Sequence, residues 1–583
     1  MLASFSRKVF RLCLWAPLAL VAVAACGNGA SSERPSCLLI TLDTTRVDAL
    51  GAYAQAQTPH LDRLSSEGVV FDNVYTPVPL TLPAHASLMS GLYPLRHGVR
   101  DNGSLPLPKE ALTLAEAAQE NGFQTAAFVG AVVLDASFGL DQGFDTYDGP
   151  GPGKQHSERS AADVVDAALH WWAKCDRTRP YFLWVHFYDP HTPYAPPKDL
   201  GGANLRENYA GELAYVDREL ERLLARLRAD DALEETLTVV VSDHGEGFGE
   251  HEENGHSVFC FDTTLRIPLI VRPPKSNPGR FEPGTRSGEL LSLVDLYPTI
   301  AEALGFANPS DLDGRSFWGA PIGDDHGVYF ESYYGYFSFG WSPLTGWIDR
   351  TGKYIHSTEP LFFDISKDPG ETRNLFAEED ERVRKHRTRV ARLAKRRTME
   401  ADAVTPSDKA LLDGIRGLGY ASLGGAEARF PHPLENTGLP NPERMGALYE
   451  RALEGVELGK QDKLEEAERI FRQVLSENPR NYFVLDHLAT CLFRTQRYVE
   501  AAETLRTLLR DSPSQPAEVW VKLGYAEQAA QRTDRAIEAF ERAVALAPST
   551  EALEILIPLL RGRNQDERAR FYAEKLRTLQ AEG

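Results

Sequence analysis

Four short apolar runs constrain the fold of this chain more than any other feature of its sequence. They span residues 37–40, 126–129, 182–185 and 237–241. Amphipathic stretches of helical periodicity separate them, such as residues 112–121 and 212–228. Strands that are buried on both faces are apolar throughout, and strands that alternate with helices form parallel sheets. The runs therefore predict an α/β sandwich around a mostly parallel sheet.

Polar residues follow three of these four runs. Asp43 follows the first, residues 186–191 follow the third, and Asp243 and His244 follow the fourth. Ligands of such sheets gather at the carboxyl ends of the strands, and carboxylates and imidazoles bind divalent metals. We therefore expect a metal site that includes Asp43, Asp243 and His244.

The segment of residues 81–94 carries the most specific motif of the chain. It reads Thr-Leu-Pro-Ala-His, then Ala-Ser-Leu, and ends in Gly-Leu-Tyr-Pro. It resembles the sulfatase signature, in which Cys or Ser, any residue, Pro, a small residue and Arg precede an Ala-Ser-Leu helix and a Gly-x-Tyr-Pro turn. Thr81 stands at the nucleophile position and His85 at the Arg position. The resemblance to this family of the alkaline phosphatase superfamily extends over residues 36–374 and implies its sandwich fold and a metal-dependent ester hydrolase.

Threonine at position 81 changes the expected chemistry. Sulfatases oxidise their Cys or Ser to formylglycine, an aldehyde, whereas the methyl group on a threonine Cβ allows oxidation only to a ketone. The motif also resembles the nucleotide pyrophosphatase/phosphodiesterase branch, whose nucleophile is a threonine, with Asn102 at the matching place. The resemblance implies that Thr81 attacks a phosphate (di)ester from the start of a helix, where N–H groups favour an anion, while Asn102 donates to the oxyanion.

The resemblance also assigns the ligands of the metal. The expected set is Asp43, Thr81, Asp243 and His244. Zinc is the predicted divalent metal, with manganese and calcium as alternatives. Sulfatases carry a second Asp where this chain has Thr44. This difference weakens the argument for calcium as the bound metal.

Further histidines are expected on the substrate side of the site. The resemblance implies that His191 and His256 contact the substrate and stabilise its oxyanion. Together with Asp189 they form either a second metal site or a phosphate-binding cluster, and the sequence leaves both alternatives open. His186 and His251, at a strand end and in a loop, are interpreted as structural.

Three alternatives to phosphate (di)ester hydrolysis remain open from the sequence. The first is a sulfuric ester hydrolase. The second is a transferase of the phosphoethanolamine or phosphoglycerol type that acts on the cell envelope. The third is a catalytically silent scaffold whose repeats carry the function. The intact set of Asp43, Thr81, Asp243 and His244 argues against a silent scaffold.

The C-terminal part of the chain contains a repeat of 34 and 35 residues. Its three registers are Ala467, Ala501 and Ala536; Phe471, Leu505 and Phe540; and Pro479, Pro513 and Pro548. A small residue, an aromatic or Leu four positions on, and a helix-ending Pro at this period resemble tetratricopeptide repeats, which form an all-α solenoid and bind a protein or peptide. We expect the tail from about Met445 onward to be dispensable for hydrolysis of a small ester.

The N-terminus resembles the signal of a bacterial lipoprotein. Arg7, Lys8 and Arg11 precede the apolar residues 12–24, and the small residues Val-Ala-Ala come directly before Cys26. Such a signal is removed and the cysteine is acylated. We expect Cys26 to anchor the protein to a membrane of the bacterial cell envelope, on its periplasmic or extracellular face. A secretory signal with an incidental cysteine is the alternative.

These segments give a domain plan for the 583 residues. It comprises a lipoprotein signal peptide (1–25), a linker (26–35), the catalytic domain (36–400), a second linker (401–443) and the repeat domain (444–583). The formal net charge of −20 argues against nucleic-acid binding, because neutralising phosphates needs a basic surface. The expected partners are therefore a phosphate or sulfate ester, a protein or peptide, and the membrane.

Overall fold

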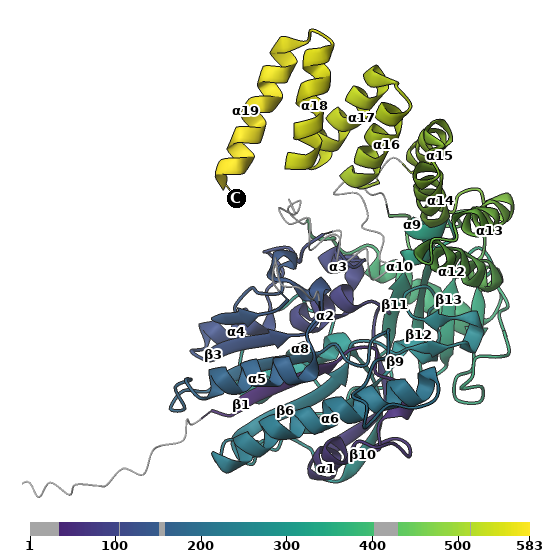
Figure 1. Cartoon of the computed structure of the whole chain (residues 1–583). Helices are drawn as coiled ribbons and strands as arrows, with labels where there is room; N and C mark the ends of the chain where they lie inside the picture. Colours follow the sequence, from purple (N-terminus) through teal and green to yellow (C-terminus); the bar gives the residue numbers. More distant parts are fainter. Residues whose placement is uncertain (1–33, 104, 151–157, 401–429, 513–514, 583) are drawn as a thin grey trace, which may run out of the picture.

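The computed structural model describes residues 34–103, 105–150, 158–400, 430–512 and 515–582. A body that contains an eight-stranded, a four-stranded and a two-stranded sheet is followed by a tail of helices (Figure 1). The predicted signal peptide, the lipidation site Cys26, most of the linker 401–443 and the repeat residue Pro513 lie outside the described residues. None of the described helices is both long enough and apolar enough to span a bilayer.

An eight-stranded sheet forms the centre of the body, in the order β10-β2-β9-β6-β1-β5-β3-β4. Its strands are β1 (Ser36–Leu42), β2 (Val69–Tyr75), β3 (Gln124–Val129), β4 (Thr146–Asp148), β5 (Tyr181–Phe187), β6 (Thr236–Ser242), β9 (Arg266–Arg272) and β10 (Thr285–Ser292). Only β9 runs antiparallel to its neighbours, β2 and β6. The predicted mostly parallel sheet is confirmed, and the four apolar runs are strands β1, β3, β5 and β6.

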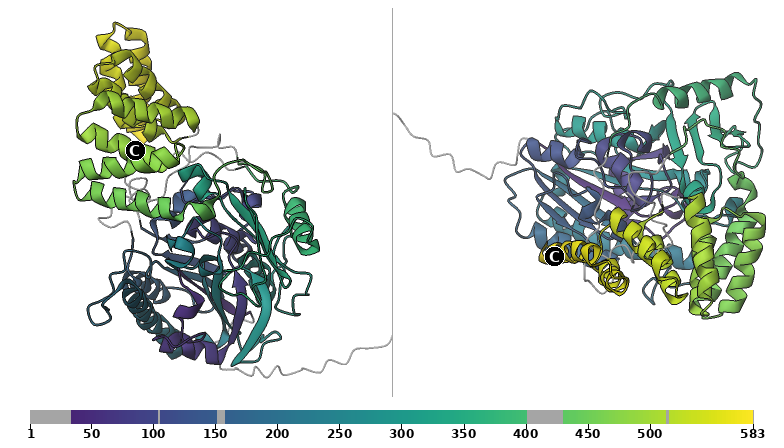
Figure 2. Two further views of the ribbon diagram at one scale, coloured as in Figure 1. Left: turned by 90° about the vertical axis from the view of Figure 1, so that its right-hand side faces the viewer. Right: turned by 90° about the horizontal axis from the view of Figure 1, so that it is seen from above.

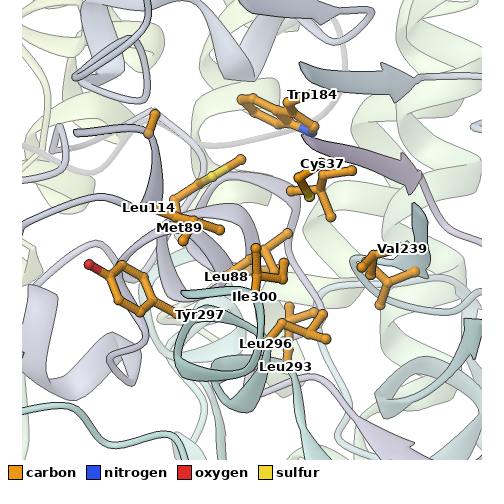
Figure 3. Packing of buried hydrophobic residues seen from close by; sticks show 14 of the residues in the cluster. Cys37, Leu88, Met89, Leu114, Trp184, Val239, Leu293, Leu296, Tyr297 and Ile300 are labelled. Carbon is orange, nitrogen blue, oxygen red and sulfur yellow. The ribbon is translucent and has the colours of Figure 1, made fainter. Parts of the chain in front are cut away.

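Helices cover both faces of this sheet. One face carries α2 (Thr81–Ser90), α4 (Leu114–Glu120) and α8 (Leu296–Leu304), and the other carries α1 (Pro59–Glu67), α5 (Ala161–Trp172) and α6 (Leu205–Ala229). Alternate residues of β1 point to opposite faces: Cys37 packs against the first helix layer and Leu38 against the second. Figure 3 shows Cys37 and Val239 of the sheet beside Leu88 of α2 and Ile300 of α8. Burial on both faces explains why these strands are apolar throughout.

A four-stranded antiparallel sheet completes the body. It consists of β11 (Val328–Ser332), β12 (Leu344–Asp349), β13 (Gly352–His356) and β14 (Leu361–Phe363), in chain order. Helices α9 (Tyr334–Phe339) and α10 (Glu381–Leu393) accompany it. The remaining short elements of the body are η1 (Val47–Ala49), α3 (Pro94–His97), η2 (Val132–Leu134), η3 (Ala136–Phe138), η4 (Leu233–Glu235), β7 (Gly247–Phe248), η5 (Glu250–Glu252), β8 (Asn254–Gly255), α7 (Asp262–Leu265) and η6 (Leu293–Asp295).

The tail is a run of antiparallel helix pairs, which confirms the predicted all-α solenoid (Figures 1 and 2). After η7 (Pro442–Arg444) come α12 (Gly446–Lys460), α13 (Leu464–Glu477), α14 (Tyr482–Arg494), α15 (Tyr498–Asp511), α16 (Ala517–Ala529), α17 (Thr533–Leu546), α18 (Thr550–Gly562) and α19 (Asp566–Glu582). The small residues Ala467, Ala501 and Ala536 of the predicted register are fully buried between helices. They allow neighbouring helices to approach closely, as the repeat requires.

Candidate active site

Two carboxylates lie side by side at the carboxyl edge of the large sheet. Asp43 follows β1 and Asp243 follows β6, and these strands are neighbours with Leu42 opposite Ser242. The backbone N–H of Thr44 donates to Asp243 Oδ1 at 3.2 Å, which ties the two strand ends together. Both carboxylates are buried. The sheet therefore brings together the residues that the sequence placed after separate strands.

Thr81 is the first residue of the buried helix α2, and its hydroxyl lies beside His244. Its Oγ1 lies 3.3 Å from His244 Nε2. The residue that caps the helix is Leu80, and no side chain makes a capping hydrogen bond there. A capping role for the hydroxyl is therefore excluded. The free N–H groups expected at this helix start are not found, because those of Leu82 and Ala84 are hydrogen-bonded and Pro83 has none.

Hydrogen bonding fixes the tautomer of His244. Its Nδ1 lies 3.0 Å from the carbonyl oxygen of Gly245, which can only accept, so Nδ1 carries the proton. The lone pair is then on Nε2, which lies 3.5 Å from Asp243 Oδ2 and 3.8 Å from Asp43 Oδ1. Burial lowers the pKa of His244 well below its ordinary value, which keeps the ring neutral and able to bind a metal.

The carboxylates show that this arrangement suits a cation. Asp43 Oδ1, Asp43 Oδ2 and Asp243 Oδ2 are buried atoms without a hydrogen-bond partner. Burial raises the pKa of Asp43 to about 6, and burial together with the Asp43 charge raises that of Asp243 further. Two adjacent buried anions are costly unless positive charge offsets them. Asp43, Asp243 and His244 offer ligand atoms within 4.8 Å of one another, so the chain's own residues fit a divalent metal.

Two histidines that the sequence did not mark as metal ligands lie beside the candidate metal site. His85 and His186 form a second group with Asp243 whose ligand atoms are within 4.8 Å of one another. His85 lies one helical turn after Thr81, and its Nδ1 donates to the Thr81 carbonyl at 2.8 Å. His186 Nε2 lies 3.5 Å from Asp43 Oδ2, while its Nδ1 accepts from Gly130 N–H at 3.4 Å.

The sequence held a signal for each of these histidines. His85 is four residues from Thr81, the spacing that puts two side chains on one face of a helix. His186 lies opposite Thr41 on the strand next to β1, although this follows only once the strand order is known. The tautomer that Gly130 imposes puts the proton of His186 on Nε2, which lies 3.5 Å from Asp43 Oδ2 without making a hydrogen bond to it. The interpretation of His186 as purely structural is therefore incomplete.

Asn102 is placed to act on a substrate oxygen. Its Oδ1 accepts from the N–H of Leu82 at 2.8 Å, next to Thr81. Its Nδ2 is buried and has no hydrogen-bond partner. The loop is held from the other side by Arg100, whose guanidinium makes two hydrogen bonds of 2.5 and 2.6 Å to the buried Glu331 of β11. Asn102 therefore presents a fixed donor at the start of α2.

His191 and His256 form the opposite wall of the site. Their ring centroids lie 5.2 Å apart, and the His256 ring lies 4.4 Å from that of His244. The His191 ring stacks on Tyr188, and His256 Nδ1 lies 3.1 Å from Glu246 Oε1. The proximity of both rings to Asp43 counteracts part of the rise that burial causes in the pKa of this carboxyl group. The structure brings both predicted histidines to the metal ligands.

Asp189 has a different position from the one that the sequence suggested. Its Oδ2 accepts from the backbone N–H of Ala161 at 2.8 Å, at the start of α5. Burial raises its pKa to about 6, and the carboxylates that add to this rise are Asp163 and Glu219 of α5 and α6. Its side chain therefore serves a helix N-terminus, and the two-histidine cluster is the better supported of the two alternatives for this wall.

The site has two halves. The metal side comprises Asp43, Thr81, Asp243 and His244, and the histidine side comprises His191 and His256. The metal ligands come from strand ends and a buried helix, whereas the histidines come from loops.

Protein-family models match the body of the chain and part of its helical tail. Residues 35–306 match the sulfatase model, and residues 249–397 match the C-terminal model of N-sulphoglucosamine sulphohydrolase. Residues 460–523 and 517–550 match tetratricopeptide repeat models. The predicted sulfatase resemblance and the predicted repeats are therefore confirmed.

Individual relatives are distant but match over most of their length. N-acetylglucosamine-6-O-sulfatase of Bacteroides thetaiotaomicron is 24% identical, and the match covers 62% of this chain and 86% of that protein. The multifunctional alkaline phosphatase superfamily protein PehA of Trinickia caryophylli is 25% identical, over 59% of this chain and 91% of that protein. The crystal structure of the phosphonate monoester hydrolase of Agrobacterium radiobacter superimposes with a TM-score of 0.54 at 23% identity, covering 62% and 95%.

The relatives bear on which of the predicted ester classes is the better supported. They are mainly sulfatases, with phosphonate monoester hydrolases among them. They support the sulfuric-ester alternative better than the main prediction of phosphate diester cleavage. The sulfatase model and the sulfatase and alkaline phosphatase superfamily relatives together support a hydrolase of sulfuric or phosphoric esters.

Proposed function

Because the chain carries a sulfatase domain followed by tetratricopeptide repeats, we propose that it is a metal-dependent ester hydrolase whose nucleophile is Thr81. The observation that carries this proposal is the position of the Thr81 hydroxyl. It lies at the N-terminus of a buried helix, 3.3 Å from His244 Nε2, beside two carboxylates that need a cation. A hydroxyl in such a position is the part of the site most able to attack a tetrahedral ester.

Asp43, Thr81, Asp243 and His244 are the residues that would hold the metal. When bound there, a divalent ion supplies positive charge that favours ionisation of the neighbouring hydroxyl and offsets the charge of the ester. Carboxylate and imidazole ligands of this kind suit zinc, manganese and calcium. The choice of zinc therefore stays a prediction from the resemblance.

The chain's residues suit a two-step displacement. Thr81 Oγ1 forms a bond to the sulfur or phosphorus atom, and the bond to the alcohol oxygen breaks, so the alcohol leaves with that electron pair and takes up a proton. Water then attacks the same atom, releases sulfate or phosphate and restores the threonine hydroxyl. Asn102 Nδ2 stabilises the oxyanion, with His191 and His256 on the opposite wall.

Sulfuric esters are the first substrate class to test, because the relatives are mainly sulfatases. The second class is phosphate and phosphonate esters, which Thr81 itself favours. A threonine cannot supply the formylglycine aldehyde of the sulfatases, so a direct threonine displacement must serve either ester. Transfer of the group to an envelope alcohol is a further outcome, which only product analysis separates from hydrolysis.

The test is a substrate screen on purified protein. Metal-free protein is reloaded with zinc, manganese or calcium and assayed against aryl sulfates, phosphate mono- and diesters, and phosphonate esters. We expect turnover of at least one class, dependent on added metal and absent in Thr81→Ala. A correctly folded, metal-loaded protein that hydrolyses none of these esters would overturn the proposal.

We also propose that the enzyme is anchored in the bacterial cell envelope through Cys26, with the repeats available to a protein or peptide partner. The support is the basic and apolar N-terminal sequence and its Val-Ala-Ala-Cys end. Mass spectrometry of the membrane fraction tests the anchor. The expected result is an acylated Cys26 at the N-terminus, lost together with membrane association in Cys26→Ser. An unmodified mature protein that begins elsewhere would contradict it.

A further inference from the structure

The first helices of the tail pack directly against the catalytic body (Figure 1). Helix α14 lies against α9, and α12 lies against the η5 turn. Asn478 Nδ2 donates to the Phe339 carbonyl at 2.7 Å in a buried contact. The Phe339 ring meets those of Tyr449 and Phe483 at centroid distances of 5.4 and 5.7 Å. This contact is apolar and buried, unlike a flexible link between independent domains.

The part of the body next to α12 is the hairpin that precedes His256. Strands β7 and β8 pair through only two residue pairs, Gly247 with Gly255 and Phe248 with Asn254. The η5 turn between them contains His251 and Glu252, both with positive φ angles, of 54° and 61°. An isolated hairpin of this length is at most marginally stable. Contacts from outside must therefore hold it, and with it the following residue, His256.

Helix α12 supplies such contacts. Its first residue, Gly446, faces Glu252 so closely that a Cβ atom there would lie 2.5 Å from Glu252 Cβ. Asn254 Nδ2 donates to Glu450 Oε1 at 2.9 Å. Tyr449 is buried in the same apolar cluster as Val258, two residues beyond His256. The hairpin and the segment after His256 are thus both in contact with one turn of the tail.

We propose that α12 is a positioning element for His256, so that the first repeat of the tail belongs to the active site. The proposal rests on the proposed function, in which His256 stabilises the oxyanion of the ester. If α12 positions His256, only the later repeats of the tail are dispensable for the hydrolysis of a small ester. The apolar cluster around Ala536, Phe540 and Leu556 in α17–α19 consists of tail residues alone, so these helices are the part available to a partner.

The test compares two alanine substitutions at opposite ends of α12 in the full-length protein. Gly446→Ala forces the helix and the η5 turn apart, because real Cβ atoms do not approach to 2.5 Å. Gly459→Ala is the matched control, because a Cβ there would have no atom within 4 Å. Both changes favour helix formation, so neither is expected to unfold the tail. We expect kcat of Gly446→Ala to fall about tenfold or more, since small displacements of a catalytic group are costly.

A second substitution provides the rescue. Glu252→Gly removes the side chain that Gly446→Ala would strike and suits the positive φ angle at that position. The double variant Gly446→Ala with Glu252→Gly should recover most of the lost kcat. The kcat of Glu252→Gly alone should stay close to that of the unmodified protein. General damage to the tail would not be rescued by a change in the catalytic body.

Hydrogen exchange of the peptides that cover residues 247–258 gives a readout that does not depend on any substrate. We expect faster exchange there in Gly446→Ala, normal exchange in Gly459→Ala, and recovery in the double variant. If Gly446→Ala matches Gly459→Ala in both exchange and kcat, the positioning role is wrong. If the unmodified protein turns over no ester, the proposed function fails, while the exchange comparison still decides whether α12 holds the hairpin.

Discussion

The metal side and the histidine side of the site are held by different kinds of structure. Asp43 and Asp243 follow two neighbouring strands of the central sheet, and Thr81 begins a helix whose residues are all buried. His191 and His256 lie in loops, one stacked on Tyr188 and the other after a two-pair hairpin that the tail contacts. The metal side therefore depends on the central sheet and on a buried helix, whereas the histidine side depends on contacts between loops and distant parts of the chain.

This difference predicts a graded response to change. Substitutions on the metal side should remove the nucleophile or the metal and leave almost no activity. Substitutions on the histidine side should lower the rate and leave the metal in place. The predictions below test this contrast, beginning with the largest expected effect.

Thr81→Ala should abolish turnover, by roughly 10⁴-fold or more, because it removes the attacking oxygen. Thr81→Ser keeps the hydroxyl and should retain measurable activity. Steady-state kinetics on the best ester of the screen, with metal content measured on each sample, checks both variants. Undiminished turnover in Thr81→Ala would contradict the covalent scheme.

Asp243→Asn should lower metal content and activity together without unfolding the protein. The substitution removes one of two adjacent buried negative charges that the metal offsets, and the amide is a weaker ligand than a carboxylate. Elemental analysis after dialysis, alongside Asp43→Asn, is the measurement. Normal metal occupancy in both variants would show that the site is misassigned.

His256→Ala should lower kcat by about 10²- to 10³-fold, the range observed when an oxyanion donor is lost. Its metal content should equal that of the unmodified protein, because the metal side does not include this ring. The two measurements together test the contrast between the halves. Loss of metal from His256→Ala would instead place this residue among the ligands and remove the distinction.

The metal-free protein should lose stability as pH rises from about 4 to about 6. Burial raises the pKa of Asp43 to about 6 in the folded protein, so the folded state binds the proton more tightly than the unfolded chain. The advantage is complete below the pKa of the unfolded chain and is lost as pH passes the folded value, a change on the order of 3 kcal/mol. Urea unfolding of metal-free Asp43→Asn, compared with the unmodified protein, should lack this part of the pH dependence.

The contrast between the halves also explains how much could be predicted from the sequence. The apolar runs determined the sheet, and residues after a buried strand must reach its carboxyl edge, so Asp43, Asp243 and His244 were found together. Asp189 also follows such a strand, but its carboxylate accepts a hydrogen bond from the N–H of Ala161. No local pattern showed this contact, because α5 begins 28 residues before Asp189 in the chain.

The features of the site that the sequence did not predict depend on contacts between remote segments of the chain. The role of His186 beside Asp43 depends on the order of β1 and β5, which the apolar runs do not specify. The contact between Gly446 and Glu252 joins a repeat to a loop that precedes it by nearly two hundred residues, and the repeat pattern contains no information about it. The repeat period predicted the solenoid but not its docking.

Mass spectrometry of the Thr81 peptide after acid quenching of a reacting mixture tests the central claim most directly. With a sulfate ester we predict a sulfo group on Thr81, with a phosphate ester a phospho group, and neither in mixtures that are quenched before substrate is added. The mass of the adduct also identifies which ester class the enzyme cleaves. An active enzyme whose Thr81 remains unmodified at every quench time, while an adduct forms on another residue, would contradict the assignment of the nucleophile.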